Sequence, residues 1–329
     1  MARRGASFSN DVVVEAVRLY VQGLPSYRTL AALLSRQLDR PVSAMTLNRW
    51  VHELGGVAKT PLEVSASLAP TGWGGILGVD GKAIFVAGEE RTLLVGVDQG
   101  TQDIVNALVL RTETEDGFER LVRDAVTVAG YPLQGLVIDA APSFMAAHLN
   151  YFPRLPLQLC RVHASRRLDF DIPKAKRSPD APLRAELKDR IRKTLFAPDE
   201  ATARHRFAAL LSDRKQYRGL GRRDTIAALE RRFDLYLTHY HLPQMPADTN
   251  ITENVIKQLG KKLRLMEGFA TMESAERFTR LLVGCYRFKR FTDSSQRTDN
   301  GRSPLELSGV EPLPPDWLRY LLQPPQQQH

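Results

Sequence analysis

The sequence contains few cysteines and no long apolar run, and each shortage excludes a class of protein. Two cysteines, Cys160 and Cys285, are too few for a disulfide framework or a four-cysteine zinc site. No run of about 18 apolar residues occurs, so we expect no transmembrane helix and no membrane partner. The first ten residues lack the apolar core of a signal peptide. Together these absences predict a cytoplasmic protein in a reducing compartment.

Positive charge is in excess, and its distribution along the chain is uneven. The formal net charge is +9, from 46 Lys and Arg against 37 Asp and Glu. Residues 80–160 carry 6 basic and 11 acidic side chains, whereas residues 161–329 carry 32 and 21. Because the basic residues are spread over several segments instead of lining one amphipathic helix, they favour an extended polyanion such as DNA over a membrane surface as the partner.

Residues 9–54 have the pattern of three short helices, of which Ser43 can cap the third. An apolar face with helical spacing runs along this third helix: Leu47, Trp50, Val51 and Leu54. Its opposite face presents Asn48, Arg49 and His52. Three helices of this size, with a short turn before the third, predict a helix-turn-helix whose third helix contacts a DNA groove. The alternative is a small helical bundle that packs against the next domain.

Residues 57–75 are rich in proline, serine and glycine, which predicts a linker. Beyond them the pattern changes to short apolar segments typical of strands. The expected order is three antiparallel strands, a helix, a strand, a short helix and a fifth strand: 76–87, 92–97, 104–110, 114–129, 136–139, 142–150 and 155–159. This order predicts an α/β fold with a mixed sheet. Helices are then expected within 183–240, at 251–265 and at 272–290, before a mostly irregular tail in which 317–322 can dock as one helical turn.

Two of the expected strands end in an aspartate, Asp80 and Asp139. If these strands are neighbours in the sheet, the two carboxylates project from the same edge and converge, which suits Mg²⁺ or Mn²⁺. A third acid is needed to hold a pair of metal ions. Glu253 is the candidate, because a helix with a basic face follows it.

Each of these acids also has a purely structural interpretation. Asp80 precedes Gly81, and its only role is then to form a turn. Glu253 can complete a capping box with Asn250 or form an i,i+4 ion pair with Lys257. The pairing of two strand-end aspartates is what favours chemistry over turn formation for Asp80 and Asp139.

Four other residues resemble ligands but are interpreted as structural. Asp98 and Asp103 flank a glycine-containing turn, where aspartate is favoured for its own hydrogen bonds. Cys160-x-x-His163 resembles half of a zinc site or a nucleophile pair. No second half lies nearby, and nothing else supports acyl transfer. We therefore expect Cys160 in the core and His163 near the sheet edge.

Four segments match a known family when they are taken together. They read Val-Asp-Gly-Lys at 79–82, Val-Ile-Asp at 137–139, Gln-Leu-Cys-Arg-Val-His at 158–163 and Thr-Asn-Ile-Thr-Glu at 249–253. In order and spacing the chain resembles the DDE transposases of bacterial insertion sequences, most closely the Mutator-like group, over about residues 76–310. The long gap before the glutamate implies, in that group, an all-helical insertion within an RNase H-like fold.

The resemblance implies a catalytic chemistry. Asp80, Asp139 and Glu253 would be the catalytic residues and would bind two Mg²⁺ (or Mn²⁺) ions, which activate water or a DNA 3′-hydroxyl and stabilise the leaving oxygen. The enzyme would nick the end of an insertion element and join the freed 3′ end to target DNA, without a covalent protein–DNA intermediate. Cys160 and His163 would support the site without binding its metal ions.

The resemblance also implies how DNA is held. Double-stranded DNA, as element ends and target, would be the partner, bound by a homodimer or larger assembly at the bacterial nucleoid. Asn48, Arg49 and His52 would contact the terminal inverted repeats. The residues expected to hold phosphates are all basic: Arg161, Arg166, Lys257, Lys261, Lys262 and Arg264.

Six segments make up the expected domain organisation. They are a helix-turn-helix domain at 1–56, a linker at 57–75, the first part of the RNase H-like catalytic core at 76–164, an all-helical insertion at 165–245, the final core helices with Glu253 at 246–292, and a C-terminal tail at 293–329. Two other functions fit the same residues: a domesticated, transposase-derived DNA-binding regulator without catalysis, and an RNase H-like structure-specific nuclease. Strand transfer separates the transposase from the nuclease.

Overall fold

The computed structural model describes residues 8–174, 178–294 and 297–324. The chain divides into two compact units, the first made of Met1–Gly75, Asp80–Leu133 and Ile251–His329, and the second of Ile76–Val79 and Gln134–Asn250. The expected helix-turn-helix segment is therefore not a unit of its own, because residues 1–75 belong to the same unit as residues 80–133. Within the described residues, no helix combines the length and apolar character needed to cross a membrane.

A five-stranded mixed sheet confirms the expected α/β class and the expected number of strands. Its order is β3-β2-β1-β4-β5. The bounds are β1 Ile76–Val86, β2 Glu89–Asp98, β3 Ile104–Leu110, β4 Gly135–Ile138 and β5 Leu157–Leu159. β2 and β3 are antiparallel, whereas β1 with β4 and β4 with β5 are parallel. Parallel pairing requires crossovers, which here contain helices α5 (Glu115–Thr127) and α6 (Pro142–Tyr151).

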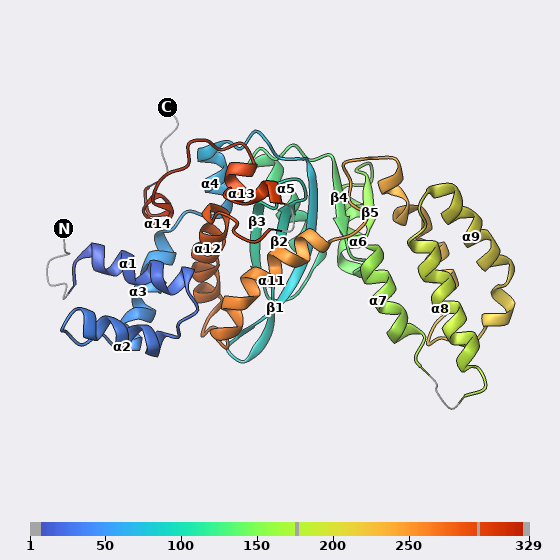
Figure 1. Cartoon of the computed structure of the whole chain (residues 1–329), viewed down its shortest axis with the longest axis horizontal. Coiled ribbons are helices and arrows are strands. Elements are labelled where there is room, and N and C mark those ends of the chain that lie inside the picture. Colours follow the sequence, from blue (N-terminus) through green and yellow to red (C-terminus); the bar gives the residue numbers. More distant parts are fainter. Residues whose placement is uncertain (1–7, 175–177, 295–296, 325–329) are drawn as a thin grey trace. The chain divides into compact units, whose positions relative to one another are not determined.

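The core of the first unit lies between its strands and two long helices, α11 (Asn250–Leu265) and α12 (Met272–Phe288). Alternate residues of β2 enter this core, which α11 lines with Val255, Ile256, Leu259 and Leu263. α5 also packs against β2 and β3 (Figure 1). The Leu121 carbonyl of α5 accepts a hydrogen bond of 3.1 Å from the Asn106 side chain. The strands of this unit are thereby held on both sides.

The three expected N-terminal helices are present as α1 (Asn10–Gln22), α2 (Tyr27–Gln37) and α3 (Ala44–Val57). Each begins after a serine whose side chain accepts a backbone N–H, and Ser43 caps α3 as expected. α3 packs closely on α12, since a Cβ added at Gly55 would lie 2.5 Å from the Arg277 carbonyl oxygen. This three-helix segment therefore packs on α12 within the first unit, as the bundle interpretation expects, and the helix-turn-helix stays a prediction (Figure 1).

The prediction of an irregular linker at 57–75 is wrong, because this segment contains helix α4 (Pro61–Leu68). Thr60 and Glu63 form a capping box, and Pro61 occupies the first helical position, where proline is favoured. Val64 is buried in the core of the unit. The composition of the segment suggested a linker, whereas Thr60, Pro61 and Glu63 form a recognisable signal for the start of a helix.

The tail beyond 292 is also more ordered than expected. It contains η4 (Arg297–Asp299), α13 (Pro304–Leu307) and α14 (Trp317–Leu321), and the turn expected at 317–322 is confirmed as a helix. α14 packs on α12, since a Cβ added at Gly284 would lie 2.3 Å from a methyl group of Leu321. Residues 295–296 and 325–329 of the expected tail lie outside the described residues.

The second unit is largely helical beyond β5, as the pattern at 183–240 predicts. Its elements are α7 Arg161–Asp171, α8 Ala181–Leu195, α9 Glu200–Ser212, η1 Arg214–Tyr217, α10 Thr225–Glu230, η2 Phe233–Tyr236 and η3 Thr238–Tyr240. Met245, after the last of these, packs against Ile76 of β1 and Val137 of β4. The helices thus begin and end beside the parallel strands of this unit.

Candidate functional site

The two aspartates expected to act together follow a pair of neighbouring parallel strands. Val79 of β1 is paired with Ile138 of β4. Asp80 directly follows Val79, and Asp139 directly follows Ile138. The prediction that the two strands are neighbours in the sheet is therefore confirmed. β1 continues to Val86, so Asp80 lies inside a strand and not at its end.

Backbone amides fix one oxygen of each carboxylate. Asp80 Oδ1 accepts the N–H of Gly81 at 2.8 Å, and Asp139 Oδ1 accepts the N–H of Ala141 at 3.0 Å. Both side chains are half-buried. A carboxylate held by its own backbone beside solvent has a defined direction without being enclosed, which suits a ligand for a hard cation.

Glu253 lies in the first turn of α11, and this turn is tied to the first unit's sheet. Thr252, the residue before it, is fully buried and accepts a hydrogen bond of 2.8 Å from Gln99, which follows β2. Two turns later, Lys82 of β1 lies against Gly260, where an added Cβ would be 2.8 Å from its Cε. These two contacts hold α11 against β1, the strand that contains Asp80, and against the end of β2.

The capping-box interpretation of Glu253 is wrong. That box requires the Glu253 carboxylate to accept the backbone N–H of Asn250. This N–H donates instead to Asp248 Oδ1, at 3.1 Å. Asn250 is already the first residue of α11, so the capping position belongs to Thr249.

Two segments of the family resemblance meet in the second unit. Thr249 donates to Cys160 Sγ through its backbone N–H at 3.4 Å and its hydroxyl at 3.3 Å, and its hydroxyl oxygen lies 3.3 Å from His163 Nδ1. Burial acts to raise the pKa of the Cys160 thiol, but hydrogen bonds from His163 and Thr249 outweigh it and lower that pKa. Cys160 is buried and His163 half-buried, as expected. The contact joins the residue before α11 to the start of α7, a role for Thr249 that spacing alone did not predict.

Asp98 serves the structure, as its interpretation as a turn residue predicts. It is fully buried, and its two oxygens accept six hydrogen bonds, from Gly74 N, Gly75 N, Gly100 N, Thr101 N, Thr101 Oγ1 and Tyr131 Oη. Its lone pairs are therefore filled by protein donors, which excludes it as a metal ligand.

Asp103 has a role beyond its turn. Both of its oxygens bind the Arg287 guanidinium at 2.7 Å, and both side chains are fully buried. Trp73 Nε1 also donates to Asp103 at 3.1 Å, and Arg287 donates to the Ser65 hydroxyl of α4 at 2.9 Å. This network connects α4, α12 and the turn before β3, and no local signal in the sequence predicts it.

The basic face of α11 contains three of the four predicted cations. Lys257, Lys261 and Arg264 are exposed at helical spacing. Lys262 is not, and its assignment to DNA is wrong: it is 3% exposed, and its Nζ lies 3.6 Å from the centre of the Tyr20 ring. Burial lowers the pKa of Lys262 to about 8. Lys262 is one residue beyond Lys261, and this single step along α11 places its side chain on the apolar face of the helix.

Of the other residues expected to contact DNA, three are exposed and His52 is bonded to another part of the protein. Asn48 and Arg49 of α3 and Arg166 of α7 are exposed. His52 is half-buried, and its Nδ1 accepts a hydrogen bond of 2.8 Å from Arg277 of α12, so its expected role on the DNA-facing surface is replaced by packing.

Arg161 likewise connects two helices within the second unit. Its guanidinium lies 5.2 Å from the centre of the Phe196 ring and donates to the Leu195 carbonyl at 3.4 Å. The prediction that Arg161 holds phosphate is corrected accordingly, because its charge is stacked against the end of α8.

No family model matches the chain, and no curated protein matches it significantly.

Proposed function

We propose that this protein is a DNA transposase that nicks the ends of an insertion element and joins them to target DNA. In this proposal the sheet belongs to an RNase H-like domain, α1 to α3 form a helix-turn-helix, and Asp80, Asp139 and Glu253 are the catalytic carboxylates. The observation that carries the proposal is the parallel register of Val79 with Ile138, which makes two aspartates the next residues of neighbouring strands. The proposal requires Glu253 to join them.

The donor set fits divalent cations. Carboxylate oxygens are hard ligands of the kind that Mg²⁺ and Mn²⁺ prefer, and no thiolate or imidazole is among the three proposed residues. When bound, two such ions would lower the pKa of the attacking water or 3′-hydroxyl and stabilise the leaving oxygen of an in-line displacement. Asp80 and Asp139 would contribute direction, because Gly81 and Ala141 hold one oxygen of each.

The remaining residues of the proposed site position the helix that carries Glu253. Thr249 is bonded to Cys160 and lies beside His163, and Thr252 accepts a hydrogen bond from Gln99. These contacts support a positioning role for Cys160 and His163, in line with the family resemblance. Lys257, Lys261 and Arg264 continue along the exposed face of the same helix, where a phosphate backbone would be attracted to them.

Recognition of the element ends is assigned to the exposed side of α3. Asn48 and Arg49 are exposed on this side, where Arg49 lies 3.8 Å from Glu53. Asparagine and arginine are side chains that pair with base edges in a major groove. The partner is therefore double-stranded DNA, bound by a homodimer or larger assembly that brings two element ends together.

The test is cleavage of labelled linear DNA that carries the native element ends, with Mg²⁺ or Mn²⁺ and with EDTA. We expect metal-dependent nicks at the ends, followed by joined products. Asp139→Asn should abolish cleavage and leave DNA binding nearly intact, because binding depends on basic residues elsewhere. Full nicking activity in Asp139→Asn would contradict the assignment of the three acids.

The two alternative functions give different products in the same assay. A domesticated regulator would bind the ends tightly without nicking them. A structure-specific nuclease would cut in a metal-dependent way but would leave no joined product, and it would show no preference for element ends.

A further inference from the structure

The helical part of the second unit holds nearly all of the protein's net charge. Residues 165–245 contain 19 Lys and Arg against 11 Asp and Glu, a net charge of +8. The rest of the chain contains 27 and 26, a net charge of +1, so that the two parts sum to +9. A concentration of positive charge in about a quarter of the chain raises the local concentration of anionic ligands there. The proposed catalytic site uses none of these residues, and only Arg166 among them was expected to contact DNA.

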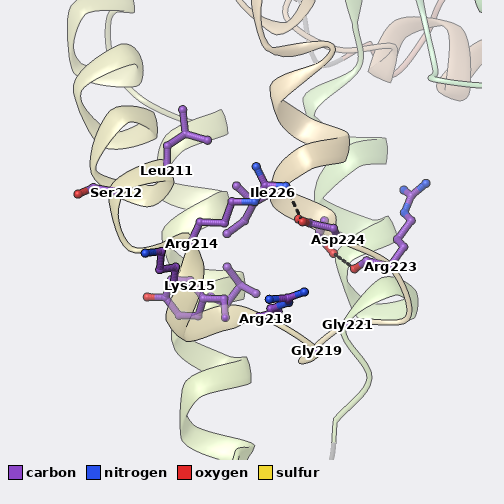
Figure 2. A pocket seen from close by; sticks show the side chains of 13 residues that line it. Leu211, Ser212, Arg214, Lys215, Arg218, Gly219, Gly221, Arg223, Asp224 and Ile226 are labelled. Carbon is purple, nitrogen blue, oxygen red and sulfur yellow. Dashed lines mark hydrogen bonds and ion pairs between the residues drawn. The ribbon is translucent and has the colours of Figure 1, made fainter.

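A cavity of about 650 Å³ lies within this charged region. It is bounded by the end of α9, by η1 and by the segment that leads into α10 (Figure 2). Its charged lining comprises four cations and one acid: Arg214, Lys215, Arg218, Arg223 and Asp224. The charged lining is therefore mostly cationic, and the volume of the cavity is large enough for a phosphate group and its sugar neighbours.

Two of the four cations are neutralised by acids and two are not. Arg214 pairs with Asp224 at 2.6 Å (Figure 2). Arg223 pairs with Asp171 at 2.7 Å. Lys215 and Arg218 are exposed, and their side chains form no hydrogen bond or ion pair with any residue that the structure describes. Their charges are thus available to an external anion.

The turn that carries Arg218 is held in place from both sides. Gly219 has a φ of +78°, which favours glycine, and Leu220 is buried beneath the turn. The Arg184 guanidinium of α8 donates to the Leu220 carbonyl, and the Arg222 N–H donates to the Asp171 carbonyl at 2.8 Å. A cavity wall fixed in this way loses little conformational entropy when a ligand binds.

We propose that this cavity binds the phosphate backbone of DNA, with Lys215 and Arg218 as direct phosphate ligands. A guanidinium presents paired N–H donors to phosphate oxygens, and an ammonium adds a compact point charge. No base edge is read here, so the contact is independent of DNA sequence and adds to the contacts of α3. The choice of DNA as the source of the phosphates rests on the proposed function, whereas the anion site rests on the charges and the cavity.

The test is binding of the full-length protein to labelled linear duplex of random sequence, measured over a range of salt concentrations. The double variant Lys215→Gln/Arg218→Gln should bind roughly tenfold more weakly, and the slope of log affinity against log salt should fall by about two. Because neither side chain has a hydrogen-bond or ion-pair partner among the described residues, the thermal unfolding midpoint of the double variant should equal that of the wild type.

A matched control removes two charges from α8 and α9, outside the cavity. Lys193 pairs with Asp189 and Arg204 pairs with Glu200, each at 2.7 Å. Lys193→Gln/Arg204→Gln should therefore change DNA affinity much less. An equal loss in both double variants would show that only total charge matters and would overturn the cavity as a site.

Cleavage of element ends by the same proteins separates this inference from the proposed function. If the wild type binds DNA through the cavity but never cuts it, the phosphate site stands and the transposase proposal fails. If the wild type cuts and the cavity variant binds as tightly as the wild type, the site fails and the transposase proposal stands. A wild type that binds no DNA would overturn both.

Discussion

Asp98 and Asp103 flank a turn in the first unit, whereas Asp80 and Asp139 come directly after Val79 and Ile138, which are paired in two parallel strands. In the sequence all four aspartates look alike. In the structure they differ in burial, because Asp98 and Asp103 are fully buried and Asp80 and Asp139 are not. The protein itself fills Asp98 with six donors and encloses Asp103 with Arg287. Asp80 and Asp139 are half-buried, with one oxygen of each fixed by a backbone amide. An acid saturated by its own protein stabilises the fold, and one that faces solvent in a fixed direction can hold something else.

Two neighbouring lysines of α11 repeat this contrast among cations. Lys261 is exposed on the basic face, and Lys262 is buried under Tyr20 with a hydrogen bond of 3.3 Å to the Pro25 carbonyl. A rotation of about 100° per residue along the helix separates them. Residue type therefore predicts function only when the face of the element is also known.

The largest effect on stability is expected at Asp103. Asp103→Ala leaves the Arg287 guanidinium buried without its counter-charge, which should lower the free energy of unfolding by about 3–5 kcal/mol. Urea denaturation measures the change, read from the midpoint at an unchanged slope.

A double variant controls for the size of the loss at this pair. Asp103→Leu/Arg287→Met removes both charges and should destabilise less than Asp103→Ala alone, because no unpaired charge stays buried. If the double variant loses the sum of the two single losses, the pair does not act as a unit and the contrast with Asp139 weakens.

A smaller, pH-dependent effect is expected at Lys262. Its pKa falls from the usual 10.5 to about 8 in the folded protein because of burial. Below pH 8 the folded state carries the whole penalty of the buried charge, and the unfolded chain keeps its proton up to about pH 10.5. The contribution of Lys262 to stability therefore rises as the pH is raised from about 8 to about 10.5.

Two methionine variants isolate this effect. Lys262→Met should stabilise the protein at neutral pH by at most about 1 kcal/mol, since the lost contact with Tyr20 offsets part of the gain. The difference in unfolding midpoint from the wild type should shrink toward high pH. Lys261→Met, at the exposed neighbour, should show no such trend. A constant difference across the pH range would mean that Lys262 does not titrate in this window.

Local signals predicted the elements well, and long-range contacts explain the errors. The strands, the three N-terminal helices and the turn at 317–322 follow from apolar periodicity and caps, because these depend on neighbours in the chain. Helix α4 was missed although Thr60-Pro61-x-Glu63 signals its start, since composition was given more weight than caps. The Asp103–Arg287 pair joins residues 184 positions apart, and no pattern in the sequence predicts such a contact. The register of Val79 with Ile138 is likewise a property of the folded sheet.

The smallest effect on stability is expected at Asp139, and it gives the clearest test of the difference between Asp139 and Asp103. Asn keeps the Oδ1 acceptor that Ala141 N–H uses, and the side chain is half-buried, so Asp139→Asn should change the free energy of unfolding by no more than about 0.5 kcal/mol. Denaturation of this variant beside Asp103→Ala measures the difference directly. Loss of strand cleavage with unchanged stability is what a carboxylate reserved for chemistry requires. A loss of stability as large as that of Asp103→Ala would place Asp139 among the structural acids and remove the distinction on which the proposed site depends.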